Sequence, residues 1–221
     1  MALSPRLLKS NKSGRTIYYT GLGDGFSWDN LNNWSTVSHA SNIPITSQPG
    51  VDDTVIINSS AYLDASSYNP IIKILIQNGS STISNLSITV LQYAIFNDNT
   101  TNYIAINGEA IFNEYATNAG EINGNATFND SSSNNGGTVN LNAIFNDTSI
   151  AFGYGAINGS AIFNNSAVLG EAVIGGSVTF NNNASNYAGL VYGLATFTGN
   201  SCTEDSGAFL GGTSPSPPPV C

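Results

Sequence analysis

Residues 125–147 read NATFNDSSSNNGGTVNLNAIFND, so that the motif Asn-Ala-x-Phe-Asn-Asp occurs twice, seventeen residues apart. The same phenylalanine recurs along the chain at spacings of 16, 16, 17, 18, 17 and 17 residues, at Phe96, Phe112, Phe128, Phe145, Phe163, Phe180 and Phe197. A second landmark, Ile or Val, stands six residues before each of these phenylalanines except the first. A fixed period of this kind is typical of solenoids, in which each unit buries its apolar face against its neighbours.

Within one repeat, the apolar residues alternate as in a β-strand. Ile106, Gly108, Ala110 and Phe112 form one face, and the positions between them hold mostly polar residues. A unit of 16–18 residues is too short for a βαβ unit, which needs about thirty residues. We therefore predict an all-β fold, a single-stranded, right-handed parallel β-solenoid with the phenylalanines stacked in one column.

Composition shifts divide the chain into four predicted regions. Trp28, Trp34 and neighbouring aromatic residues suggest a compact cap over the first open coil, which would shield an exposed sheet edge. The C-terminal residues are rich in Pro and Ser and are expected to be extended and outside the core. The regions are a basic N-terminal arm (1–15), an N-terminal cap and entry region (16–69), the solenoid (70–201) and a Ser/Pro-rich tail (202–221).

The charge distribution limits the partners of the chain. Only 9% of the residues are charged, the net charge is −9, and four of the five basic residues lie in the arm, at Arg6, Lys9, Lys12 and Arg15. An acidic body of this kind is expected to repel nucleic acid. The arm could tether the protein to an acidic partner, or it could be a solvated terminus. No run approaches the roughly 18 apolar residues of a membrane span.

The residues two positions after the first four repeat phenylalanines are acidic. In register, they would stack about 5 Å apart at one corner of the solenoid, which could chelate Ca²⁺ or form a carboxylate pair like that of a retaining glycosidase. The alternative is that they are solvated turn residues, and exposed corners offer no apolar pocket to raise one pKa for acid catalysis. No other cofactor is expected. The residues of this acidic ladder are Asp98, Glu114, Asp130 and Asp147.

Other side chains suggest further possibilities. Beyond residue 15, Lys73 and His39 are the only basic side chains and lie outside the regular repeats, which argues against a polysaccharide lyase. Cys202 and Cys221 could form a disulfide across the tail. Three Asn-x-Ser/Thr sequons directly follow repeat phenylalanines and could carry glycans along one edge, at Asn129, Asn146 and Asn164.

Two stretches resemble known surface proteins. GDGFSWDNLNNWS (23–35) with PGVDDTVIIN (49–58), followed by a solenoid, resembles the entry of surface-exposed solenoids such as bacterial adhesins. The repeat NGxATFN(D/N), over roughly residues 94–220, resembles repeat proteins of large algal viruses of the chlorovirus type, which form surface glycoproteins or fibres. The resemblance implies a non-enzymatic structural protein of a virion surface, bound to other capsid proteins through its arm or cap.

Several alternatives accompany this expectation. The chain could associate with itself or contact a host-surface glycan. It could instead be a cell-surface adhesin or carbohydrate-binding solenoid, or a tailspike-like enzyme acting on glycans. The first sixteen residues lack the apolar stretch of a secretory signal, which favours assembly of a virion over export of an adhesin.

Overall fold

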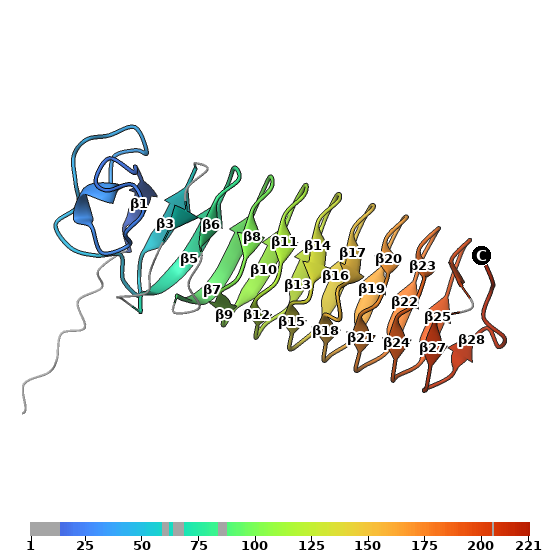
Figure 1. Cartoon of the computed structure of the whole chain (residues 1–221). Coiled ribbons are helices and arrows are strands. Elements are labelled where there is room, and N and C mark those ends of the chain that lie inside the picture. The colour runs from blue at the N-terminus through green and yellow to red at the C-terminus, as the bar shows by residue number, and fades with distance from the viewer. Residues whose placement is uncertain (1–13, 59–61, 64–68, 84–87, 205) are drawn as a thin grey trace, which may run out of the picture.

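The computed structural model describes residues 14–58, 62–63, 69–83, 88–204 and 206–221, and it shows one rod of stacked parallel coils (Figure 1). Apart from a single 3-10 turn at Leu31–Asn33, the described elements are all β-strands. Within these ranges no helix is long and apolar enough to cross a membrane. The parallel β-solenoid predicted from the repeat is therefore confirmed.

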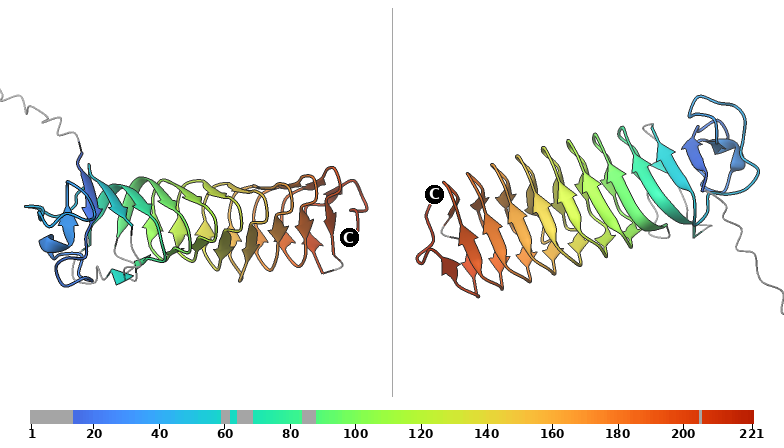
Figure 2. Two further views of the ribbon diagram at one scale, coloured as in Figure 1. Left: turned by 90° about the horizontal axis from the view of Figure 1, so that it is seen from above. Right: turned by 180° about the vertical axis from the view of Figure 1, so that it is seen from behind.

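Each regular coil contributes one short strand to each of three columns (Figures 1 and 2). The phenylalanine column contains β3 (Thr54–Ile57), β5 (Ile71–Gln77), β7 (Thr89–Phe96), β10 (Glu109–Phe112), β13 (Ala126–Phe128), β16 (Ala143–Phe145), β19 (Ala161–Phe163), β22 (Val178–Phe180), β25 (Ala195–Phe197) and β28 (Thr213–Ser214). The isoleucine–valine column starts on the first residues of β5, continues on the first residues of β7 and contains β9 (Ala105–Ile106), β12 (Glu121–Ile122), β15 (Thr138–Val139), β18 (Ala156–Ile157), β21 (Val173–Ile174), β24 (Leu190–Val191) and β27 (Ala208–Phe209).

The third column, which we call the asparagine column, is a separate sheet of nine strands. All neighbours in it pair in parallel, so it provides one strand for each of nine successive coils. Its members are β4 (Tyr62–Leu63), β6 (Thr82–Ile83), β8 (Thr101–Asn102), β11 (Thr117–Asn118), β14 (Ser133–Asn135), β17 (Ile150–Phe152), β20 (Val168–Leu169), β23 (Ser185–Asn186) and β26 (Cys202–Thr203).

The core follows the predicted alternation. Ile106, Ala110 and Phe112 are buried, whereas Asn107, Glu109 and Ile111 on the other face are exposed. From Phe96 to Phe197 the repeat phenylalanines stack as predicted, with neighbouring ring centroids 4.6–5.3 Å apart. Parallel pairing aligns identical positions, and buried apolar area then stabilises every coil against the next.

The corners explain why Asn, Asp and Gly recur in the repeat. Two residues after each repeat phenylalanine from Phe96 to Phe180, the backbone adopts positive φ of 57–59°, a conformation that Asn and Asp tolerate better than most residues. At another corner, a Cβ on Gly108 would lie 1.5 Å from the carbonyl oxygen of Gln92. Glycine in the Asn-Gly motif therefore allows two backbones to approach closely.

A compact N-terminal module covers the first coil (Figure 1). Strand β1 (Thr16–Tyr19) pairs in parallel with β3 and, on its other side, antiparallel with β2 (Trp34–Ser35). Trp28 and Trp34 are fully buried with ring centroids 4.7 Å apart, and the indole of Trp34 donates to the carbonyl of Trp28. The two tryptophans thus form the core of the cap, and the edge strand β2 is only two residues long.

The coils extend beyond both predicted limits of the solenoid. Strands β1 and β3, inside the predicted entry region 16–69, already pair in parallel like the coils that follow. Beyond residue 201, β26, β27 and β28 pair in register with the preceding coil. Parallel pairing depends on backbone hydrogen bonds and does not require the phenylalanine motif. A prediction based on that motif therefore missed the coils that lack it.

The C-terminal residues are also not a free extended tail. Val220 forms a parallel bridge with Thr203, whose amide donates to the carbonyl of Pro219. A disulfide between Cys202 and Cys221 fastens the end of the chain to β26. The segment therefore covers the last strand of the asparagine column through a single parallel bridge.

Candidate functional site

The four residues of the acidic ladder are brought together at one corner. Glu114, Asp130 and Asp147 are exposed and Asp98 is half-buried. Carboxylates of the ladder accept hydrogen bonds from backbone amides of the preceding coil. Asp130 accepts from the amide of Glu114 at 3.1 Å, and Asp147 accepts from the amide of Asp130 at 3.3 Å. Asn165 and Asn182 continue the column with amide side chains. The acids therefore satisfy backbone donors at the corner.

The ladder also concentrates negative charge. A hydrogen bond with the Asp98 carboxyl and the charges of Asp98 and Asp130 raise the pKa of Glu114. This shift comes mainly from neighbouring acids, since the side chain of Glu114 stands in water. The arrangement therefore differs from a glycosidase acid that is held protonated by an apolar pocket.

Metal binding at this corner stays a prediction. In the part of the chain that the structure describes, no three His, Cys, Asp or Glu side chains converge in a group that could hold a metal ion. The stacked acids form a line along the rod, whereas Ca²⁺ is bound by six to eight oxygens arranged around it.

The three sequon residues belong to an asparagine ladder on the outside of the coil. Each side-chain amide donates to the side-chain oxygen of the residue one coil earlier, with distances of 2.8 Å for Asn129 and 2.9 Å for Asn146 and Asn164. The asparagines of the ladder are half-buried, and its last member, Thr198, is exposed. The ladder runs from Asn78 through Asn97, Asn113, Asn129, Asn146, Asn164 and Asn181 to Thr198. The nitrogen that a glycan would occupy is thus already a donor within the ladder.

A second asparagine ladder lies inside the solenoid and was not foreseen. The sequence predicts asparagine on exposed faces, yet Asn102, Asn118 and Asn134 are at most 1% exposed. Asn102 donates to Asn118 and Asn118 to Asn134, both at 2.8 Å, and Asn134 donates to the carbonyl of Gly137. These bonds satisfy polar groups that would be unfavourable to bury unpaired.

A recurring dipeptide in the sequence could have revealed this ladder. Thr-Asn or Ser-Asn stands four or five residues before the Ile/Val landmark at Asn102, Asn118, Asn134 and Asn186. Ala151 and Leu169 replace asparagine in the two coils between Asn134 and Asn186. The interior therefore accepts either a hydrogen-bonded amide or an apolar side chain at this position.

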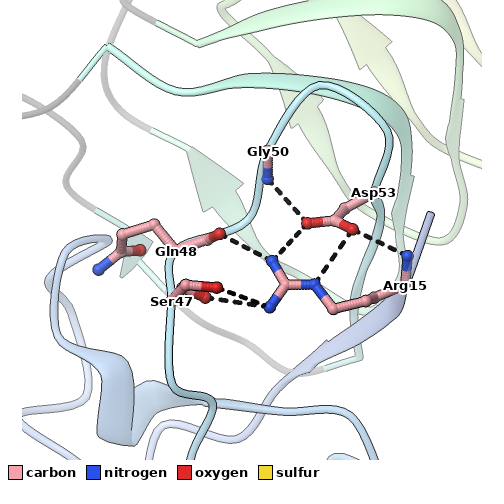
Figure 3. A network of polar contacts seen from close by, with 5 residues as sticks. All are labelled: Arg15, Ser47, Gln48, Gly50 and Asp53. Carbon is pink, nitrogen blue, oxygen red and sulfur yellow. Dashed lines mark hydrogen bonds and ion pairs between the residues drawn. The ribbon is translucent and has the colours of Figure 1, made fainter. Parts of the chain in front are cut away.

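Arg15, which the sequence places in the basic arm, is fixed within the cap (Figure 3). Its guanidinium forms an ion pair with Asp53 at 2.6 Å and also donates to the carbonyl oxygens of Ser47 and Gln48. Asp53 accepts the backbone amides of Arg15 and Gly50 as well. The network links β1 to the loop that leads into β3.

The electrostatics of this network favour the ion pair. Burial by itself would raise the pKa of Asp53, but hydrogen bonds from Arg15 and Gly50, together with the guanidinium charge, outweigh it and lower the pKa. The side chain of Asp53 is 8% exposed. Arg15 is thus engaged inside the protein, and the other basic residues of the arm, Arg6, Lys9 and Lys12, lie outside the described residues.

The two remaining basic side chains are separate from the acidic ladder. Lys73 lies in β5, and His39 is an exposed residue of the N-terminal module that contacts Asn58 at 3.2 Å. Neither belongs to the strands that position the acidic ladder. A lyase mechanism, which combines a basic residue with carboxylates, finds no such combination at this corner.

Comparison with protein-family models, with curated proteins and with solved structures finds no match to this chain.

Proposed function

We propose that this chain is a non-enzymatic structural shaft of a virion surface, and that it holds its C-terminal end away from the particle. The observation that carries the proposal is the uninterrupted stack from β3 to β28, closed by a folded module at one end and by a disulfide-fastened segment at the other. Ten strands at about 4.8 Å per step correspond to a shaft about 43 Å long.

The N-terminal module is the proposed attachment end. It exposes apolar side chains, with Leu22 at 58%, Phe26 at 52%, Val37 at 61% and Ile43 at 60%. Exposed apolar side chains of this size offer area that a contact with another protein can bury. The opposite end consists of small and Pro-rich segments, which lack backbone donors at each proline and so resist pairing with further strands.

The experiment is to label intact particles of the source virus with antibodies against the coils. We expect gold label on the outer surface of purified particles, and we expect a Leu22→Asp, Phe26→Asp double variant to be absent from particles while its circular dichroism stays unchanged. Tyr154→Asp, which adds a charge at an exposed turn of the coils, is the matched control. Label confined to a cell surface would refute the virion setting and support the adhesin alternative.

The alternative of a carbohydrate-binding adhesin is favoured by exposed tyrosines along the coils. Tyr103 is 43% exposed, Tyr115 65% and Tyr187 52%, and aromatic rings with a polar edge suit contacts with sugars. Glycan-array binding that is lost in a Tyr103→Ser, Tyr115→Ser variant would support it. Cleavage of algal or bacterial polysaccharide by the purified chain would instead support the enzyme alternative and contradict a purely structural role.

A further inference from the structure

The outer surface of the phenylalanine column carries a regular stripe of isoleucine and threonine. Parallel pairing places one such residue per coil in a straight line along the rod. Ile111, Ile144 and Ile162 are 36%, 38% and 39% exposed, so the stripe presents apolar area to solvent. In chain order the stripe contains Ile95, Ile111, Thr127, Ile144, Ile162, Thr179 and Thr196.

The stripe and its flanks are almost free of charge in a protein of net charge −9. The asparagine ladder from Asn97 to Thr198 flanks the stripe on one side. The column on the other side consists of the residues two positions before each stripe residue; it begins at Tyr93, ends at Leu194 and otherwise contains Asn, Ser and Glu109. Among the residues of these three columns, all within described ranges, Glu109 is the only charged one. A second acidic copy would therefore meet little repulsion on this face.

The order of large and small residues in the stripe is self-complementary. We propose that two copies of this chain associate face to face through the stripe, with antiparallel rods and a two-fold axis at Ile144. Reversing the order then places Ile95 opposite Thr196, Ile111 opposite Thr179 and Ile162 opposite Thr127. Each large side chain outside the centre meets a small one, as an interface between identical surfaces requires.

The flanking columns fit the same axis. Tyr93 falls opposite Leu194, which pairs two exposed apolar side chains, and Glu109 falls opposite the neutral Ser177. At the corner, Glu114 meets Asn182 and Asp130 meets Asn165, so the acidic half of one rod faces the neutral half of the other. Only Asp147 meets its own equivalent, at the exposed corner, where salt screens the repulsion.

A shallow groove on this face provides a seat for the central contacts. It has a volume of about 390 Å³ and is lined by residues of β10, β13 and β16, among them Thr127, which the strand pairing places between Ile111 and Ile144. In the two-fold arrangement, Ile162 of the second copy enters this groove and contacts Thr127 of the first copy. By symmetry, Ile162 of the first copy contacts Thr127 of the second. Threonine lacks the δ-methyl group of isoleucine, so Thr127 leaves space that the partner fills.

The size of the face predicts weak, reversible association. Seven coils at about 4.8 Å and five residues at about 3.3 Å give roughly 550 Å² per copy, or about 1,100 Å² in total. Stable complexes commonly bury about 1,200–2,000 Å², so this pair belongs at the lower limit. Association is therefore expected only at high concentrations of the free chain, and the shaft proposal does not depend on it. Rods anchored side by side through their N-terminal modules would be parallel and would not form this antiparallel pair.

The test uses the full chain in sedimentation experiments over a wide concentration series. We expect a monomer–dimer equilibrium whose dissociation constant rises at least about a hundredfold in Ile144→Asp, because two like charges then face each other at the axis. The matched control is Tyr154→Asp, which places the same charge at a turn outside the three columns, where Tyr154 is 82% exposed. Higher salt is expected to strengthen the dimer.

Crosslinking tests the register separately from the affinity. The native cysteines are joined in the disulfide, so an added cysteine is the sole free thiol. A short bismaleimide should link Ile144→Cys to itself, and should link Thr127→Cys to Ile162→Cys in a mixture but not Thr127→Cys to itself. Monomeric wild type at every concentration, an unchanged constant in Ile144→Asp, or self-linking only at Thr127→Cys would each overturn the proposal.

Discussion

The ring of Phe163 lies on the ring of Phe145, with centroids 4.6 Å apart and planes 3° from parallel. The two residues are eighteen positions apart in the chain and directly paired in β16 and β19. Neighbouring coils therefore bring identical residues together, and the interaction is repeated at every step of the phenylalanine column. Stability in such a rod depends chiefly on contacts between adjacent coils.

Truncation in the middle of this stack should weaken the whole rod. Phe145→Ala removes a fully buried ring that is sandwiched between Phe128 and Phe163, and we expect unfolding to become easier by about 3–5 kcal/mol. Denaturant unfolding followed by circular dichroism measures this change. Phe209→Ala is the control, because Phe209 is half-buried and contacts Phe197 by its edge at the end of the stack. Equal effects of the two variants would contradict a dependence on stacked neighbours.

The buried asparagine ladder should be more sensitive than the exposed asparagines. Asn118→Ala removes the acceptor of Asn102 and the donor to Asn134, which leaves buried polar groups unpaired, and we expect a loss of about 2–4 kcal/mol. Asn123→Ala, in the same coil but exposed, should change the free energy of unfolding by less than about 0.5 kcal/mol. Similar losses for both variants would show that burial does not govern the ladder.

Replacement of Glu114 should stabilise the corner. The folded-state pKa of Glu114 is raised, so the ionised side chain disfavours the folded state at neutral pH, and this penalty disappears below its ordinary pKa of about 4.3. Glu114→Gln should therefore raise the melting temperature at pH 7 but not at pH 3. Glu114→Asn should raise it further at both pH values, because asparagine tolerates the φ of 59° better.

A calcium titration separates this electrostatic account from metal binding. If the acidic ladder binds Ca²⁺, the wild type should gain melting temperature in millimolar calcium and Glu114→Gln should lose that gain. Magnesium at equal concentration is the control for screening. A melting temperature that responds equally to both ions would contradict a specific calcium ladder.

The Arg15–Asp53 pair should make the cap sensitive to acid. The folded-state pKa of Asp53 is lowered, so its contribution is present above the ordinary aspartate pKa of about 3.9 and is lost as the pH falls through the folded value. At pH 7, Asp53→Asn should destabilise the cap by about 1–3 kcal/mol, seen as faster amide exchange in β1. The difference from wild type should vanish at low pH, whereas Asp52→Asn, at an exposed neighbour, should leave exchange unchanged.

The disulfide should stabilise the last coil. Cys202 and Cys221 close a loop with a sequence separation of 19, for which loop-closure entropy corresponds to about 3 kcal/mol. Reduction should increase amide exchange in β26 and at Val220 and Cys221, while β13 stays protected. A Cys202→Ser, Cys221→Ser variant should behave like the reduced protein and should not respond to reductant. Uniform loosening of all coils would contradict a local role.

Spacing was sufficient to predict the phenylalanine stack and the acidic corner, because a solenoid converts sequence period directly into spatial register. Phe209 was not predicted to join the stack, since its distance from Phe197 breaks the period and it lies in the isoleucine–valine column opposite Val191. The position of Asn118 inside the rod was also not predicted. The residue type does not show whether an asparagine points into the rod or toward solvent. Burial of Asn118 is favourable only because an asparagine in each neighbouring coil forms a hydrogen bond with it.

By itself, the sequence determined the strand period, the coil length and the identity of the stacked core, because these depend on local alternation and on repetition at short range. Only the tertiary structure decided that Arg15 pairs with Asp53, that Cys221 returns to Cys202, and that the last coil continues past residue 201. The first two contacts join segments that share no repeat, so they depend on how the two ends of the rod fold back over their open edges. The last coil keeps the 18-residue spacing, as from Leu190 to Ala208, but lacks the phenylalanine motif, so only the backbone pairing reveals it.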